Sequence, residues 1–147
     1  MVHALKQIWR TLKPGGLLLD LRPYSANCPV EVVAGDRMEV AGRIDDSAGL
    51  PDDEAASAAI GRAAHEGWFR LEQSGSFDFM WGWDDLEEMC SYVEEKWADW
   101  LNFPLDARRN AARLMREMGA SQVRIRLNMI IARYQKSYET NPFLPRV

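Results

Sequence analysis

Apolar residues follow two periods along this chain, one typical of helices and one typical of strands. Spacings of three and four residues, bounded by Pro, Gly and Asp, predict helices over residues 3–12, 52–65, 84–100 and 106–118. Short apolar or alternating runs predict a hairpin within residues 30–44 and strands over residues 17–21, 68–72, 77–83 and 121–136. Helices interspersed with strands favour an α/β fold, in which helices cover a sheet.

The first and last strands carry the most specific expectations. Residues 17–21 form a short apolar run behind a turn at residues 14–16, and such a run predicts a strand buried on both faces. The last strand alternates apolar and basic residues at first and then becomes apolar at every position, which is typical of a strand entering the covered centre of a sheet. Between them, residues 68–72 and 77–83 flank a predicted turn at residues 73–76.

An aromatic stripe marks the segment at residues 77–83. A period of two places its four aromatic side chains on one face of the strand: Phe77, Phe79, Trp81 and Trp83. Such a stripe either packs under a helix or offers a platform to a flat ring, and we favour packing under a helix. The acidic residues of the next helix are interpreted as its solvated face rather than as an acid–base pair: Glu87, Glu88, Glu94 and Glu95.

Charge is unevenly distributed over the 147 residues, although the net charge is only −4. Residues 44–100 hold 15 acidic and 3 basic residues, whereas residues 101–147 hold 3 acidic and 9 basic residues. The acidic middle argues against a broad nucleic-acid surface, because it would repel phosphates. We expect the basic end to pair with the acidic middle, or with a second copy, rather than with a phosphate-bearing partner.

Residues with metal or nucleophilic chemistry are few. Cys28, Cys90, His3 and His65 show no metal-ligand spacing, so no metal site is expected, and no catalytic residue can be assigned. A disulfide is not expected in the cytoplasmic location that the start of the sequence suggests, because that start lacks a signal-peptide core. No apolar run approaches the roughly 20 residues that span a bilayer, so a membrane partner is not expected.

One motif resembles a known family. The segment from Ala4 to Asp20 is predicted as a helix, a turn and an apolar strand, and Arg10-Thr11-Leu12-Lys13-Pro14-Gly15-Gly16 comprises the end of the helix and the turn. It resembles the R-x-L-K-P-G-G segment that precedes the fifth strand in class I methyltransferases, which use S-adenosylmethionine. The resemblance is specific over residues 4–22.

The resemblance implies the C-terminal half of a Rossmann-like methyltransferase sheet, a partial α/β fold with a mixed sheet flanked by helices. Residues 77–83 would be the sixth strand, and residues 123–134 the seventh, antiparallel between the fifth and sixth. Residues 1–138 would form one partial domain with an insertion at about 28–67, followed by a loose tail at 139–147. The hairpin and helix of that insertion are of the kind that shapes a substrate pocket.

The chain departs from the family where the family binds its cofactor. Its ten glycines include no G-x-G, and no strand followed by a glycine-rich turn precedes Ala4. The Asp/Asn-Pro-Pro-Tyr motif of amino-methylating members is also missing, and Arg22-Pro23-Tyr24 resembles it only superficially. We therefore expect no cofactor-binding residue in this chain, and S-adenosylmethionine only where a missing segment or a partner completes the site. The chain is then a fragment of a longer enzyme, a natural half, or a reused remnant.

Three functions follow from these expectations. The first is the substrate-side portion of a methyltransferase, inactive alone, with Arg22 and Tyr24 facing the substrate. The second is a non-catalytic, oligomeric interaction module derived from a methyltransferase. The third is an unrelated α+β ligand-binding domain with an apolar pocket lined by the aromatic stripe.

The first two functions share one structural expectation, because the fourth strand of the family's sheet is missing from this chain. Without it, the strand from Leu17 to Leu21 is an exposed apolar edge, and such an edge recruits another strand. We expect a homo-oligomer, pairing with an N-terminal methyltransferase half, or a cover formed by the hairpin at residues 30–44.

Overall fold

The computed structural model describes residues 2–24, 27–119 and 121–138, which form four α-helices, a short 3-10 turn and five strands. In chain order the elements are α1 Val2–Thr11, β1 Leu17–Pro23, β2 Pro29–Ala34, β3 Arg37–Arg43, η1 Ser47–Gly49, α2 Leu50–His65, β4 Phe69–Trp83, α3 Leu86–Lys96, α4 Leu105–Met118 and β5 Gln122–Lys136. The strands form one sheet in the order β1-β5-β2-β3, and β4 also pairs with β5. The fold is therefore α/β, as the sequence predicted at that level. The predicted mixed sheet is wrong, because the described strands pair antiparallel.

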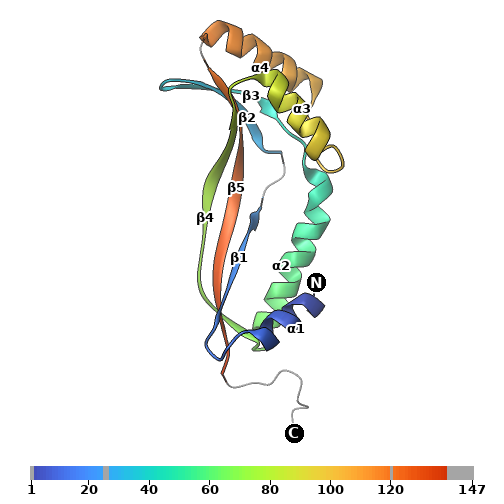
Figure 1. The fold of residues 1–147 in the computed structure, drawn as a ribbon, viewed down its shortest axis with the longest axis vertical. Helices are drawn as coiled ribbons and strands as arrows, with labels where there is room; N and C mark the ends of the chain where they lie inside the picture. The colour runs from blue at the N-terminus through green and yellow to red at the C-terminus, as the bar shows by residue number, and fades with distance from the viewer. Residues whose placement is uncertain (1, 25–26, 120, 139–147) are drawn as a thin grey trace. The chain divides into compact units, whose positions relative to one another are not determined.

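Strand β5 is the centre of this sheet, since it pairs with three others (Figure 1). Its Lys136 N–H donates to the Gly16 carbonyl at 2.8 Å, and its Asn128 carbonyl accepts from the Tyr24 N–H at 2.9 Å. The partner numbers rise in one strand as they fall in the other, so β1 runs antiparallel to β5. Strand β2 is also antiparallel to β5, with Val32 opposite Val123.

Strand β4 follows β5 in the same antiparallel sense. The Ser137 N–H donates to the Trp68 carbonyl at 3.0 Å, and farther along the strands the Gln122 amide donates to the Asp84 carboxylate. The turn predicted at residues 73–76 is wrong, because β4 is one strand of 15 residues. Strand β4 pairs with the equally long β5, and this pairing is not visible in sequence periodicity.

The residues divide into two compact units. Unit 1 consists of Met1–Arg22, Pro51–Phe77 and Ile130–Val147, and unit 2 consists of Pro23–Leu50 and Asp78–Met129. Strands β4 and β5 contribute residues to both. The insertion predicted at about 28–67 is shared between the units, and the predicted tail at 139–147 lies outside the described residues.

Unit 1 packs α1 and α2 against strands β1, β4 and β5. Its buried core is Leu5, Ala59, Ile60, Ala63, Trp68, Phe69, Ala132 and Tyr134. The C-terminal end of α1 is held by Lys136, whose ammonium donates to the Leu12 carbonyl at 2.7 Å and lies 4.0 Å from the Trp9 ring centroid. A cation at this helix end interacts favourably with the exposed carbonyl groups. The turn after α1 is thereby attached to β5.

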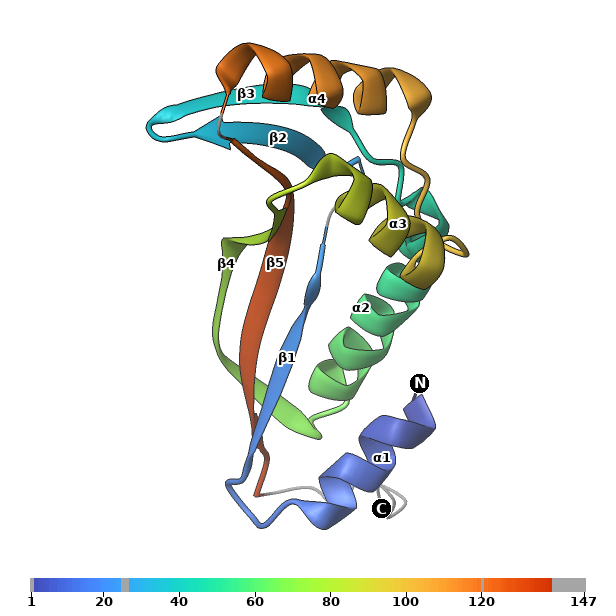
Figure 2. The ribbon, with the colours of Figure 1, turned by 45° about the horizontal axis from the view of Figure 1, so that its top comes forward.

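Unit 2 packs α3 and α4 against the β2–β3 hairpin and the first half of β5 (Figure 2). Its largest fully buried side chains include Ile44, Met89, Val93 and Ile125. Helix α4 approaches β3 so closely that a Cβ added at Gly42 would lie 2.5 Å from the Ala107 Cβ. The predicted hairpin at residues 30–44 is confirmed by β2 and β3.

Helix ends differ in detail from the sequence predictions. Helix α3 begins after Asp85, whose carboxylate accepts from the Glu87 and Glu88 N–H groups, and it ends at Lys96 rather than at residue 100. Helix α4 begins at Leu105, one residue before the predicted range of 106–118, and its N-cap residue Pro104 makes no side-chain hydrogen bond. Its predicted end at Gly119 is confirmed by that glycine's positive φ of 75°.

Strand β1 is not buried on both faces, which corrects the prediction for residues 17–21. Leu17, Leu19 and Leu21 are 50%, 62% and 56% exposed, whereas Leu18 packs against the core of unit 1. The physical reason is that the unit 1 core covers only the face that carries Leu18. The run of leucines therefore predicted the strand correctly, but it did not predict how many faces of the strand are covered.

Strand β5 was predicted to become apolar and covered on both faces, and this is also wrong. In unit 2 it buries odd-numbered residues, Val123 and Ile125, while in unit 1 it buries even-numbered residues, Ala132 and Tyr134. Alternate residues of a strand point to opposite faces. Within each unit, only one set of alternate β5 residues is buried, so neither part of the strand is covered on both faces.

The turn glycine Gly15 gives a stability test of the α1–β1 connection. Its φ is +71°, and a Cβ there would overlap the Tyr138 hydroxyl. We expect Gly15→Ala to lower the free energy of unfolding by about 2 kcal/mol, measured by urea denaturation.

The matched control is Gly61→Ala. Gly61 lies in α2, where an added Cβ meets nothing within 4 Å, so alanine is expected to stabilise the protein by about 0.5–1 kcal/mol. Equal effects of the two substitutions would contradict the role given to the turn.

Candidate functional site

The outer side of β1 is a row of unpaired backbone groups. In an antiparallel strand, successive residues direct their N–H and C=O groups to opposite sides. Gly16 and Tyr24 bond to β5, so the even-numbered residues face that strand. The odd-numbered residues Leu17, Leu19 and Leu21 then direct their groups to the side where no described strand pairs. We call these three residues the β1 edge.

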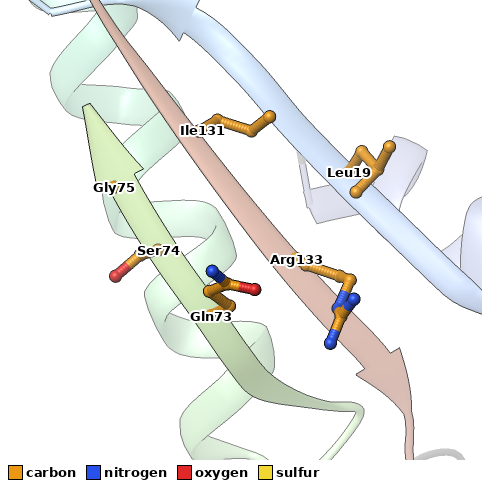
Figure 3. Close-up of a pocket in the computed structure, with 6 residues that line it drawn as sticks. All are labelled: Leu19, Gln73, Ser74, Gly75, Ile131 and Arg133. Carbon is orange, nitrogen blue, oxygen red and sulfur yellow. The ribbon is translucent and has the colours of Figure 1, made fainter. Parts of the chain in front are cut away.

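A shallow hollow of about 290 Å³ lies beside this edge in unit 1 (Figure 3). It is lined by residues of three strands: Leu19, Gln73, Ser74, Gly75, Ile131 and Arg133. The Arg133 guanidinium is 3.0 Å from the Glu72 carboxylate, so its charge is already neutralised. The hollow combines two aliphatic side chains with uncharged polar groups, which suits contact with a neighbouring surface better than acid–base chemistry.

Arg22, which the sequence suggested as substrate-facing, is fastened to α2. Its Nη1 donates to the Asp53 carbonyl at 2.8 Å and to the Ser57 hydroxyl at 2.9 Å. Its Nε lies 3.2 Å from the Asp20 carboxylate, and its side chain is only 14% exposed. These bonds hold the beginning of α2 on β1 and leave little of the guanidinium for a ligand.

Two tyrosines lie beside β1 in sequence or in space, Tyr24 and Tyr134. Tyr24 belongs to unit 2, where its side chain is exposed and its backbone N–H bonds to the Asn128 carbonyl. Within unit 1, burial raises the pKa of the Tyr134 phenol, and the Asp20 carboxylate raises it further, while Arg22 lowers it. Tyr134 therefore stays protonated at neutral pH.

Unit 2 contains a buried charge network that the sequence did not single out. Glu31 of β2 is fully buried, and its two carboxylate oxygens accept from the Nε groups of Arg124 and Arg126, each at 2.8 Å. Arg126 also lies 3.2 Å from Asp78 of β4. The side-chain bonds from Glu31 and Asp78 raise the pKa of the Arg126 guanidinium. This network joins three strands by complementary charge.

One sequence signal could have found the network. Glu31 interrupts an apolar strand, and Arg124 and Arg126 share one face of β5, so their pairing needs only the register of β2 against β5. That register places Glu31 opposite Arg124. Sequence reasoning missed it because strand register depends on the tertiary fold.

The favoured interpretation, that the whole aromatic stripe packs under a helix, holds for Trp81 and Trp83, whereas Phe77 and Phe79 are 43% and 42% exposed. Trp81 and Trp83 contact Tyr92 of α3 and Trp97 beyond it, with the rings of Trp81 and Trp97 5.0 Å apart. Phe79 meets Trp81 edge-on at 6.0 Å. These rings pack against one another, mostly edge-on. None of the ring contacts among the described residues includes Phe77, which belongs to unit 1.

Acidic and basic segments pair within the chain, as expected. Arg126 meets Asp78 in unit 2, Arg108 contacts Glu94 there, and Arg133 contacts Glu72 in unit 1. The second Arg126 partner, Glu31, belongs to the first segment of the chain rather than to the acidic middle. Three ion pairs between the acidic middle and the basic end therefore form within the chain.

The described residues give no support for metal or thiol chemistry. Among residues 2–24, 27–119 and 121–138, no group of three or more His, Cys, Asp or Glu side chains could hold a metal ion. Burial raises the pKa of the half-buried Cys90 thiol, although Arg108 opposes this, so a reactive thiolate is disfavoured at neutral pH. Over the same residues, no helix combines the length and apolarity needed to cross a membrane.

Glu31 provides a test of the network. We expect Glu31→Gln to lower the free energy of unfolding by about 2 kcal/mol in urea denaturation, because two guanidinium groups lose their carboxylate. Glu39→Gln is the control, since Glu39 lies on the same hairpin in an exposed pair with Arg37 and should change stability by no more than about 0.5 kcal/mol. Similar values for both variants would contradict a structural role for the buried pair.

Comparisons with known proteins were made by sequence and by structure. A scan against family models found no match, and searches of curated proteins and of solved structures found none either.

Proposed function

We propose that this chain is the substrate-side, C-terminal half of a class I methyltransferase that uses S-adenosylmethionine. The observation that carries the proposal is the position of β5, which runs antiparallel between β1 and β4. This is the order that the resemblance implies for the fifth, seventh and sixth strands. The strand in the fifth position also follows the helix and turn that carry the family motif.

The geometry of the motif supports the proposal. Residues 13–16 form a tight turn in which the Gly16 N–H donates to the Lys13 carbonyl at 2.8 Å. Gly16, the residue just before β1, is already bonded to the sheet, since its carbonyl accepts from the Lys136 N–H of β5. The turn therefore delivers the chain from α1 into the sheet, which is the role that the resemblance gives it.

The substrate would be met beyond the carboxyl end of β1. Ligands of open α/β sheets bind outside the carboxyl ends of the strands. In this chain, Pro23 is the last residue of β1 and Tyr24 follows it, and both belong to unit 2. Tyr24 is the exposed candidate for substrate contact, while Arg22 is a positioning residue that holds α2 on β1.

The donor site is assigned to another segment, since the sequence has no glycine-rich turn of the required kind. In the family arrangement, that segment would add a strand parallel to β1 at the β1 edge. The bound S-adenosylmethionine would supply the methyl group. The residues of this chain would contribute by holding and orienting the substrate, which can supply much of the rate acceleration in a transfer between two bound groups.

A non-catalytic interaction module is the second candidate, and the β1 edge favours it. Three exposed leucines and their unpaired backbone groups form a surface that recruits a strand whether or not chemistry follows. The two candidates differ in whether the assembled protein binds the donor.

The test uses a C-terminal affinity tag on the gene at its natural locus. We expect the purified protein, as a longer chain or as a complex, to contain a strand followed by a glycine-rich turn. By calorimetry, we expect it to bind S-adenosylhomocysteine with micromolar affinity. The recombinant 147-residue chain is the matched control and should show no saturable binding.

Two results would contradict the methyltransferase proposal. One is natural material that lacks such a segment and does not bind S-adenosylhomocysteine, which would leave the interaction module. The other is micromolar binding by the recombinant 147-residue chain, which would show that the donor site was placed on the wrong segment.

A further inference from the structure

We infer that two copies of the 147-residue chain pair through the β1 edge, antiparallel, with a two-fold axis at Leu19. The inference goes beyond the proposed function, because it concerns the chain when no donor-binding segment occupies that edge. It joins two sheets into one continuous sheet.

The backbone of β1 is already arranged for this pairing. Leu17, Leu19 and Leu21 all direct their N–H and C=O groups away from β5, as the bonds of Gly16 and Tyr24 to β5 require. In a two-fold arrangement, Leu19 would face Leu19 of the second copy, and Leu17 would face Leu21 of the second copy. Each of these pairs exchanges two N–H···O bonds in an antiparallel ladder.

The ends of the strand select Leu19 as the centre. An axis at Leu21 would set Leu19 against Pro23, which has no N–H to donate. An axis at Leu17 would set Leu19 against Gly15, whose φ of +71° places it in the turn rather than in extended backbone. Only the Leu19-centred register uses all three outward residues of both copies.

The side chains of the edge fit a second copy. All three outward residues are leucines, so an isologous pairing places apolar side chains against one another and no charge against itself. The nearest charges, Asp20 and Arg22, lie 3.2 Å apart and neutralise each other. The β1 edge also lacks the lysines, bulges and internal proline that protect edge strands from pairing.

The expected dimer is reversible rather than permanent. Stable protein interfaces bury about 1,200–2,000 Å² in total, and pairing of one short strand from each copy buries less. We therefore expect a dissociation constant in the micromolar range.

The first experiment is sedimentation velocity of the full 147-residue chain over a series of concentrations. The wild type should change from monomer to dimer as concentration rises, whereas Leu19→Lys should stay monomeric, because two ammonium groups would meet at the axis. Leu105→Lys is the matched control, since Leu105 is 61% exposed, as Leu19 is 62%, but lies in α4 of unit 2. Circular dichroism checks that both variants fold.

The second experiment tests the register with cysteines in a Cys90→Ser background. Mixing Leu17→Cys with Leu21→Cys should give a disulfide-linked dimer under mild oxidation, because those positions face each other. Leu17→Cys alone should not cross-link, since its two copies would lie about 14 Å apart along the strands.

Several outcomes would overturn the inference. These are a wild type that is monomeric at every concentration, a dimer that survives Leu19→Lys, and equally efficient cross-linking of Leu17→Cys alone. None of them bears on donor binding, which is read out by S-adenosylhomocysteine, so the dimer and the proposed function can fail separately.

Discussion

The hydrogen bonds of β5 are the constraint on which the rest of this structure depends. Strand β5 pairs with β1, β2 and β4, and residues of this one strand enter the cores of both units. Its ammonium group at Lys136 also holds the end of α1. Because β5 satisfies only one side of β1, the opposite side of that strand remains open. The proposed function and the proposed dimer both start from this open side.

The sequence pattern predicted the order of helices and strands well. Helix periodicity found α1, α2, α3 and α4, and the hairpin was found from its turn and flanking strands. The sequence pattern did not predict which faces of the strands are buried. The run from Leu17 to Leu21 was predicted to be covered on both faces, yet the unit 1 core covers only one. The turn expected within β4 is replaced by one strand of 15 residues that pairs with β5. These outcomes depend on which elements meet, and periodicity does not specify that.

The candidate site shows the same division. The sequence suggested Arg22 and Tyr24 as substrate-facing residues. In the structure, Arg22 donates hydrogen bonds to Asp53 and Ser57 of α2, which are remote from it in sequence. The Glu31 network was missed for a related reason, since its partners Arg124 and Arg126 come together only through the β2–β5 register. Side chains with several remote partners are the least accessible to inference from sequence. The free edge of β1, by contrast, was anticipated from the absence of a fourth strand.

The most direct measurement is amide hydrogen exchange along β1, monitored by NMR at several protein concentrations. The N–H groups of Leu18, Asp20 and Arg22 should be protected at every concentration, because they face β5. Those of Leu17, Leu19 and Leu21 should exchange rapidly in dilute solution and slow down as copies pair. Equal protection of both sets in dilute solution would contradict the account, because the outer side of β1 would then be paired within a single chain.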